Sequence, residues 1–383
     1  MLGNFEYHNP TKIYFGKDAL DNLLPEIKNY NRIMLSYGKG SVIKIGLYHK
    51  VLSLLEEAGK TVIDDGGVMP NPTYDRVLEG CRKAREENID FILALGGGSV
   101  CDYGKVVSVS AYCEGDFWEK YIENKEKPKC KIIPMGCVLT MAGTGSEMNS
   151  KGVISHKGLM KKAGVRCHHF PVFSILNPMW TMTLPKYQTM SGCFDVLSHI
   201  MENYFSGEDD NTSDYMAEGI MRSLIHASLK VLEDPNDYEA RSNIMWCACW
   251  GLNGLTECGK GGGDWEVHKI GHAISVVTDA THGMTLSAVS YKYYDMIMPF
   301  GVKKFKRFAE NVWRVNSAGK SDIEVAKEGL FCMKEWMQKL GLVTDMKDLG
   351  VTKDNLEIIL KSVVYNKGGY KQLTPKEVKE ILS

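Results

Sequence analysis

The first half of the chain alternates short apolar runs, which predict strands, with amphipathic stretches, which predict helices. The predicted strands cover residues 12–15, 32–36, 61–63, 91–95 and 132–139, and the predicted helices cover residues 18–27, 47–58 and 75–87. Glycine follows several of these strands. Strands that alternate with helices in this way predict a parallel sheet with helices on its faces.

After about residue 185 the pattern changes to helical periods with few strand-like runs. These periods cover residues 188–205, 212–233, 237–256, 284–297, 303–315, 322–340 and 354–364. The sequence TPKE at 374–377 is a capping box with proline at the first helical position, so it predicts one more helix. We therefore predict an α/β domain over residues 1–184 and an all-helical domain over residues 185–383.

Composition narrows the class of protein. Hydrophobic residues make up 44% and charged residues 24% of the 383 residues, which is typical of a soluble globular chain. The 46 basic and 47 acidic residues nearly cancel, so charge supports neither a nucleic-acid nor an anionic-membrane partner. We see no membrane span and no signal peptide, and the eleven cysteines lack paired spacing. We expect a cytoplasmic protein.

Three glycine-containing turns follow predicted strands. They are YGKGS at 37–41, ALGGGSV at 94–100 and TMAGTGSE at 140–147. The carboxyl ends of parallel strands share one edge of a sheet, where such folds bind ligands, so the three turns together predict a dinucleotide site. The second turn departs from G-x-G-x-x-G because Cys101 occupies the last glycine position.

The first turn and the next strand give opposite indications about the nicotinamide cofactor. Lys39 and Ser41 in the first turn are donors suited to a 2′-phosphate, which favours NADP(H). Asp64 and Asp65 end the next predicted strand and would favour NAD(H), because an acidic side chain there hydrogen-bonds the ribose hydroxyls. We predict NADP(H) as the preferred cofactor, with NAD(H) as the alternative.

Histidine and aspartate recur at helical spacing in the second half. Asp195 and His199 are four residues apart, as are His268 and His272, and His282 follows in a loop. Either pair alone is more often a hydrogen-bonded core histidine or a salt bridge. Together, a carboxylate and several imidazoles form a donor set for a divalent metal such as Fe²⁺ or Zn²⁺. The order is not H-E-x-x-H, since Lys269 follows His268.

These motifs together resemble the iron-dependent, group III alcohol dehydrogenases, in particular the butanol dehydrogenase branch. The matching segments are GGGSVCDYGK (96–105), MAGTGSE (141–147), DVLSHIMENY (195–204) and HKIGHAISVVTDATHG (268–283). Further matches run from NPTKIYFG near the start to YNKGGYKQLTPKEVKEIL near the end. The resemblance implies a Rossmann-like α/β domain, a helical domain of dehydroquinate synthase-like architecture, an active site in the cleft between them, and a homodimer.

The resemblance also implies roles for individual residues. One divalent ion, Fe²⁺, Zn²⁺ or Co²⁺, would be held by Asp195, His199, His268 and His282. His272 matches a non-ligand position where a proton-relay role is considered. The matching cofactor positions are Gly38, Lys39, Ser41, Asn71, Gly97, Gly98, Ser99, Asp102, Thr140, Thr144, Asn149 and Lys161.

The predicted reaction is hydride transfer between NADP(H) and a short to medium-chain primary alcohol or aldehyde, such as butanol or butyraldehyde. One alternative is a lyase of the dehydroquinate synthase type, which needs a basic pocket where this chain has Trp265, Ile270 and Ile274. Another is a nucleotide-binding protein that has lost catalysis, but all four candidate metal ligands are present. Polyol and glycerol dehydrogenases are nearer relatives that differ in pocket polarity.

Overall fold

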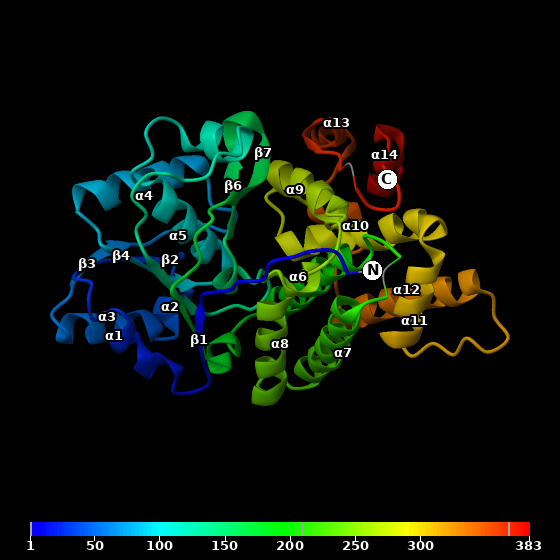
Figure 1. Cartoon of the computed structure of the whole chain (residues 1–383), viewed down its shortest axis with the longest axis horizontal. Coiled ribbons are helices and arrows are strands. Elements are labelled where there is room, and N and C mark those ends of the chain that lie inside the picture. Colours follow the sequence, from blue (N-terminus) through cyan, green and yellow to red (C-terminus); the bar gives the residue numbers. More distant parts are fainter. Residues whose placement is uncertain (1, 209, 367) are drawn as a thin grey trace. The chain divides into compact units, whose positions relative to one another are not determined.

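The computed structural model describes residues 2–208, 210–366 and 368–383, and the chain divides into two compact units. The α/β unit is Asn9–Leu184. The helical unit is Pro185–Ser383 together with the described residues up to His8. Figure 1 shows the strands of the sheet in the first unit and the long helices in the second.

The α/β unit is built on a six-stranded sheet in the order β1-β8-β5-β4-β2-β3, and every pair of neighbours is parallel. Its strands are β1 (Lys12–Phe15), β2 (Arg32–Tyr37), β3 (Thr61–Asp65), β4 (Phe91–Gly96), β5 (Met135–Leu139) and β8 (Phe173–Leu176). The predicted parallel sheet is confirmed, but β8 is absent from the prediction because its four residues are too few to show a period.

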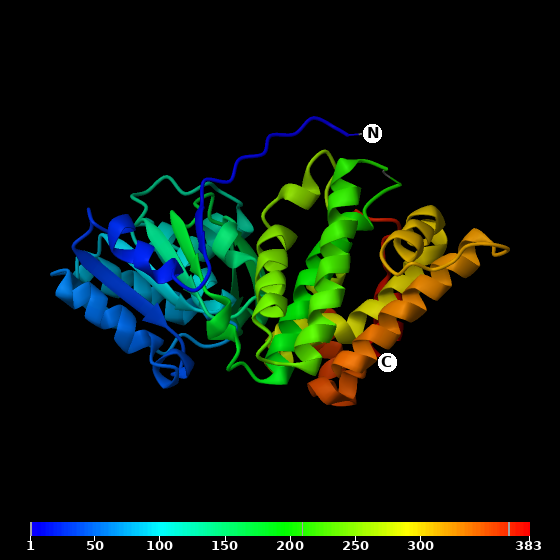
Figure 2. The ribbon, with the colours of Figure 1, turned by 90° about the horizontal axis from the view of Figure 1, so that it is seen from below.

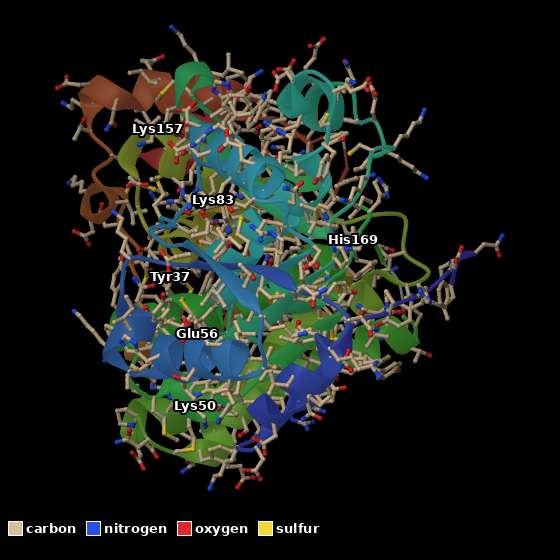
Figure 3. The ribbon with its side chains drawn as sticks, turned by 90° about the vertical axis from the view of Figure 1, so that its left-hand side faces the viewer. Tyr37, Lys50, Glu56, Lys83, Lys157 and His169 are labelled. Carbon is tan, nitrogen blue, oxygen red and sulfur yellow. The ribbon has the colours of Figure 1, made fainter. Side chains whose placement is uncertain are left out.

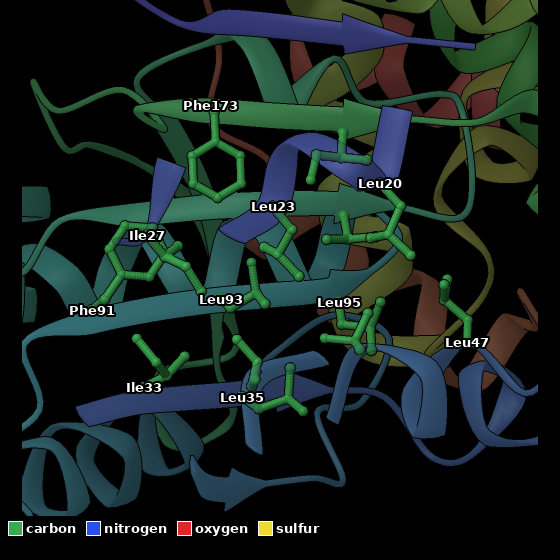
Figure 4. Close-up of a cluster of buried hydrophobic side chains, with 14 of the residues drawn as sticks. Leu20, Leu23, Ile27, Ile33, Leu35, Leu47, Phe91, Leu93, Leu95 and Phe173 are labelled. Atoms are coloured by element: carbon green, nitrogen blue, oxygen red, sulfur yellow. The ribbon is translucent and has the colours of Figure 1, made fainter. Parts of the chain in front are cut away.

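Apolar side chains cover both faces of this sheet. On one face, Leu23 and Leu47 pack with Leu35, Leu93 and their neighbours in a continuous buried cluster (Figure 4). On the other face lie the longer helices that follow β3 and β4. The helices of the unit are α1 (Leu23–Glu26), α2 (Ser41–Lys44), α3 (Leu47–Glu57), α4 (Tyr74–Glu86) and α5 (Gly98–Ser110). Burial on both faces explains why β4 and β5 read as continuous apolar runs.

A separate antiparallel hairpin, β6 (Lys151–His156) with β7 (Lys161–Arg166), completes the strands of the α/β unit. The sequence prediction missed this hairpin. Gly152, Gly164 and several lysines interrupt the apolar alternation that identifies a half-buried strand.

The helical unit is centred on α6 (Lys186–Tyr204), whose residues are all buried from Thr189 onward. A helix that is buried on every side lies in the core of its unit. It packs against α7, α8, α9 and α10. Figure 2 shows the long green helices of this unit side by side. The further helices are α7 (Thr212–Glu233), α8 (Tyr238–Gly251), α9 (Glu266–Thr278), α10 (His282–Ile297), α11 (Val302–Asn311), α12 (Asp322–Leu340), α13 (Lys353–Ser362) and α14 (Pro375–Leu382).

The predicted helical periods are confirmed apart from their ends. Helix α8 ends at Gly251, five residues earlier than predicted, and α9 was not among the predicted periods. Short 3₁₀ segments connect the longer elements at Ala19–Asn22, Ser146–Met148, Lys157–Leu159, Pro178–Thr181, Leu255–Glu257, Met298–Phe300 and Met346–Leu349, and a π-helical turn spans Trp118–Glu123. Among the described residues, no helix has the length and apolarity needed to cross a membrane.

Candidate metal and cofactor sites

Three helices of the helical unit bring the predicted metal ligands together. Asp195 and His199 lie one turn apart on α6, and both side chains are buried. His268 lies in the first turn of α9, and His282 is the first residue of α10. The site therefore depends on the packing of α6, α9 and α10.

Three of the four predicted ligands, Asp195, His268 and His282, offer donor atoms that all lie within 4.8 Å of one another, and His199 lies outside this group. The Nε2 atoms of His199, His268 and His282 lie 3.6, 3.7 and 3.7 Å from Oδ1 of Asp195. These distances are longer than ordinary hydrogen bonds. Ligands about 2.1 Å from a tetrahedral ion are about 3.4 Å apart, so the distances from Asp195 to the three imidazoles are close to those expected around such an ion.

A second carboxylate, Glu202, orients His268. Its Oε2 lies 2.6 Å from Nδ1 of His268, and its Oε1 accepts a hydrogen bond of 3.0 Å from the backbone N–H of the same residue. The ring therefore donates from Nδ1 and directs Nε2 toward Asp195. Glu202 is fully buried. The sequence analysis missed it, although its position seven residues after Asp195 places it on the same face of α6.

The buried carboxylates of Asp195 and Glu202 favour a positive charge among the four predicted ligands. Nε2 of His268 is buried and has no hydrogen-bond partner within the described ranges. Burial alone lowers the pKa of His268, but the charges of Glu202 and Asp195 and the hydrogen bond to Glu202 outweigh burial and raise it to about 9. A divalent cation would supply this positive charge, and one carboxylate with three imidazoles suits Fe²⁺, Zn²⁺ or Co²⁺. The residues present fit the predicted ion.

Two half-buried rings flank these ligands. The ring centroid of His272 lies 5.1 Å from that of His282 and 6.2 Å from that of His268. The ring centroid of Trp265 lies 5.3 Å from that of His268 and 6.1 Å from that of His199. The structure thus places His272 beside the ligands, and its proton-relay role stays a prediction.

In the α/β unit, the three glycine turns lie on one edge of the sheet, as predicted. They follow β2, β4 and β5, which are neighbouring parallel strands. The glycines in the second turn let two loops meet closely. A Cβ added to Gly98 would come within 2.2 Å of the Thr144 side chain, and one added to Gly97 would lie 3.2 Å from Met141. The predicted residues Gly97, Gly98, Ser99, Thr140 and Thr144 therefore share one region.

The structure gives Asp102 and Asn149 structural partners. Asp102 accepts hydrogen bonds from the Ser146 hydroxyl and, at 3.0 Å, from the backbone N–H of Val153. Asn149 accepts from Nζ of Lys105 at 2.8 Å, and the same ammonium donates to the carbonyl of Ser146 at 2.8 Å. These contacts shape the loop after β5, and direct contacts of Asp102 and Asn149 with a cofactor stay predictions.

The two acidic residues at the end of β3 have different surroundings. Asp65 is fully buried and bound by Ser36, Tyr103, Arg76 and Lys83 at 2.6 to 3.2 Å. The exposed Asp64 accepts hydrogen bonds from the phenols of Tyr37 and Tyr48 at 3.2 and 2.7 Å. Figure 3 labels Tyr37 and Lys83 on this side of the unit. Because these four side chains already bind the carboxylate of Asp65, we interpret its role as structural.

The remaining predicted cofactor residues also lie in the α/β unit. Gly38 and Lys39 lie between β2 and α2, α2 begins at Ser41, and Gly40 directly before it has φ +133°. Asn71 has φ +55° and accepts a hydrogen bond of 2.7 Å from Lys162. Lys161 begins β7 with its side chain 54% exposed, and its ammonium is 3.8 Å from Glu123. Their cofactor contacts stay predictions.

Comparison with known families accounts for nearly all of the chain. The model of the family described as "Iron-containing alcohol dehydrogenase" matches residues 10–178, and "Fe-containing alcohol dehydrogenase family, C-terminal" matches residues 189–383. The chain belongs to the iron-containing alcohol dehydrogenase family. The family resemblance noted in the sequence is confirmed.

Individual members of the family are similar over almost their full length. NADH-dependent butanol dehydrogenase A of Clostridium acetobutylicum is 37% identical, with 96% of this chain and 94% of the relative covered. NADPH-dependent aldehyde reductase YqhD of Escherichia coli is 35% identical, with 94% and 93% covered. The crystal structure of NADH-dependent butanol dehydrogenase A from Thermotoga maritima has a TM-score of 0.94 at 34% identity, with 100% and 98% covered. This iron-containing alcohol dehydrogenase therefore shares the fold of the butanol dehydrogenases.

Proposed function

We propose that the protein is a metal-dependent alcohol dehydrogenase and aldehyde reductase. It transfers hydride between NADP(H) and a short to medium-chain primary alcohol or aldehyde, of which butanol and butyraldehyde are the representatives. The convergence of three imidazole nitrogens on one oxygen of Asp195 carries this proposal. Family membership and relatives named as butanol dehydrogenases and an aldehyde reductase support it.

Asp195, His199, His268 and His282 would hold the divalent ion. When bound, such an ion polarises the substrate oxygen as a Lewis acid, and the nicotinamide supplies or accepts the hydride. Glu202 keeps the ring of His268 in one tautomer and orientation through two hydrogen bonds. His272 lies beside the ligand rings, where it can give a proton to the developing alkoxide or take one from the alcohol.

For the cofactor we propose a preference for NADP(H), with NAD(H) as the alternative. Lys39 in the turn after β2 offers a cation to the 2′-phosphate. Asp65 is buried and bound by two cations, so it does not repel that phosphate from an exposed position. Asp64 remains as the exposed acidic group, although two phenols donate to it.

The test is consumption of NADPH with butyraldehyde, run in parallel with NADH, before chelation, after chelation, and after reloading with Fe²⁺, Zn²⁺ or Co²⁺. We expect chelation to abolish the reaction and reloading to restore it, with a higher kcat/KM for NADPH than for NADH. Absence of turnover with both cofactors and every metal would refute the proposed activity. A preference for NADH would refute the cofactor assignment alone.

We further propose that the α/β unit binds the dinucleotide and the helical unit holds the metal. Each set of predicted residues lies within one unit, which supports this division.

We also propose a cytoplasmic homodimer. All eleven cysteines are free, as is usual in a reducing compartment, and the homodimer rests on the family resemblance. Light scattering would test the dimer, and cell fractionation would test the location.

A further inference from the structure

Trp265, the residue directly before α9, has an unusual backbone conformation. Its φ is +61° and its ψ is +12°, which is the left-handed helical region. Bulky side chains rarely adopt this conformation because their Cβ then crowds the backbone. Such strain persists only where the surrounding structure enforces it, and it is concentrated at functional sites.

The residues on either side of Trp265 are fixed by hydrogen bonds from distant segments. A carboxylate oxygen of Asp264 accepts a bond of 2.6 Å from the phenol of Tyr293, and the carbonyl of Asp264 accepts from the amide of Asn366. The carboxylate of Glu266 accepts a bond of 2.7 Å from the backbone N–H of Asn366. Helix α10 and the segment after α13 therefore hold the backbone on both sides of the strained residue.

The side chain of Trp265 is also held in place, since the indole packs against Gly263. A Cβ added to this glycine would come within 2.3 Å of the indole Nε1, so a larger residue would displace the ring. Asp264 and Glu266 are both buried, whereas Trp265 is half-buried. The chain thus directs two polar side chains inward and presents the indole beside the metal ligands.

The indole and the non-ligand histidine neighbour different ligands. Trp265 lies next to the rings of His199 and His268, whereas His272 lies next to those of His268 and His282. A substrate whose oxygen reaches the metal ligands therefore contacts two different rings. The imidazole of His272 lies on the side of His268 and His282, and the large apolar ring of Trp265 lies on the side of His199 and His268. An aromatic surface of this size suits contact with a saturated carbon chain.

We propose that Trp265 is the residue that sets the chain-length preference of the enzyme, by forming the apolar wall against which the alkyl chain of the substrate packs. This inference rests on the proposed function. Burial of one methylene is worth about fourfold in an equilibrium or rate ratio. The kcat/KM of the wild-type enzyme should therefore rise by about sixteenfold from acetaldehyde to butyraldehyde, which differ by two methylenes.

The test compares acetaldehyde with butyraldehyde in Trp265→Gly, Trp265→Asn and Trp265→Phe. Glycine and asparagine accept a positive φ, so the first two substitutions remove the indole without adding backbone strain. We expect both to reduce the butyraldehyde-to-acetaldehyde ratio of kcat/KM to below about threefold, because the methylenes lose their apolar contact. Phenylalanine restores an apolar ring and should restore most of the ratio. Trp246→Phe, on α8, is the control and should leave the ratio unchanged.

A second readout does not depend on turnover. Binding of Co²⁺ to the metal-free protein should quench the fluorescence of the tryptophan nearest to the ion. Trp265→Phe should remove most of this quenching, and Trp246→Phe should retain it. A wild-type enzyme that reduces no aldehyde would refute the proposed function. An active enzyme whose chain-length ratio is the same in the glycine or asparagine variant, or whose quenching survives in Trp265→Phe, would overturn the role of Trp265.

Discussion

Two clusters of buried charge, one in each unit, differ in the distances between their partners. In the α/β unit, Lys105 is fully buried and its ammonium donates to two oxygens at 2.8 Å, while Asp65 is bound by four side chains at hydrogen-bond distance. In the helical unit, Asp195 faces three imidazole nitrogens at 3.6 to 3.7 Å. The first arrangement is complete in the protein alone, whereas the second has the dimensions of an ion's coordination shell.

This difference distinguishes a structural charge network from a binding site. Both contain buried carboxylates and cationic or basic side chains, so composition alone does not separate them. A charge that serves the fold has partners at 2.6 to 3.2 Å, as Asp65 has. In a ligand-binding site, the charged and basic atoms face a common point and are farther apart than hydrogen-bonded atoms, as Asp195 and the three imidazoles are. Substitutions in the two regions should therefore fail in different ways.

The largest expected effect is that of His268→Ala on turnover. The loss of a metal ligand should lower kcat/KM for butyraldehyde by about a thousandfold or more, because several kcal/mol of transition-state stabilisation depend on the ion. Binding of NADPH, measured by fluorescence titration, should change by less than about twofold, because the cofactor residues predicted here lie in the other unit. Full activity in this variant would contradict the metal assignment.

In the α/β unit, the corresponding substitution is Lys105→Met. It leaves buried acceptors without their donor, so the free energy of unfolding should fall by about 3 kcal/mol, measured by urea denaturation. The affinity for Co²⁺ should not change. Lys83→Met is the matched control, since its side chain is 34% exposed and its pairing with Asp65 should contribute less than about 1 kcal/mol. An equal decrease in the free energy of unfolding in the two variants would contradict the claim that the buried lysine contributes more to stability than the exposed one.

Glu202→Gln should have an intermediate effect, confined to the metal site. The amide retains the shape but weakens the hydrogen bond to Nδ1 of His268, so the affinity for Co²⁺ should fall by about 10- to 100-fold. Competition with a chelator measures this change. Glu218→Gln, another buried glutamate of the helical unit, is the control for a general loss of stability. A decrease in metal affinity shared by both variants would indicate an indirect effect.

The last expected effect is a pH dependence of the free energy of unfolding of the metal-free protein. Burial, together with the nearby charges of Glu202 and Glu266, outweighs the Tyr293 hydrogen bond and raises the pKa of Asp264 from 3.8 to about 7. The folded state therefore keeps a proton that the unfolded chain releases, and stability from this group decreases as pH rises from about 4 to 7. Urea denaturation across this range should show the slope in the wild type and a flatter profile in Asp264→Asn.

Much of this architecture could be predicted from the sequence, because strands buried on both faces and helices with a clear period leave strong patterns. The five strands predicted at 12–15, 32–36, 61–63, 91–95 and 132–139 correspond in this way to β1, β2, β3, β4 and β5. The β6–β7 hairpin was missed, since its glycines and lysines hide the alternation. Short β8 gives too little sequence for a period to be visible.

The candidate site could be predicted in part. The spacing of Asp195, His199, His268 and His282 indicated a metal, and the structure brings these residues together. Glu202 was missed because a lone glutamate in a helix is usually a surface residue, and only three-dimensional packing shows its contact with His268. The strained backbone of a tryptophan before α9 leaves no sign in a sequence.

The central claim is that the converging side chains of the helical unit form one specific metal site. The most direct measurement is a titration of the chelated, full-length protein with Co²⁺, followed by visible absorption. We predict saturation at one equivalent per chain, with the intense bands of a four-coordinate ion, and loss of those bands in Asp195→Asn. Weak binding without a defined stoichiometry, or an unchanged spectrum in that variant, would contradict the account.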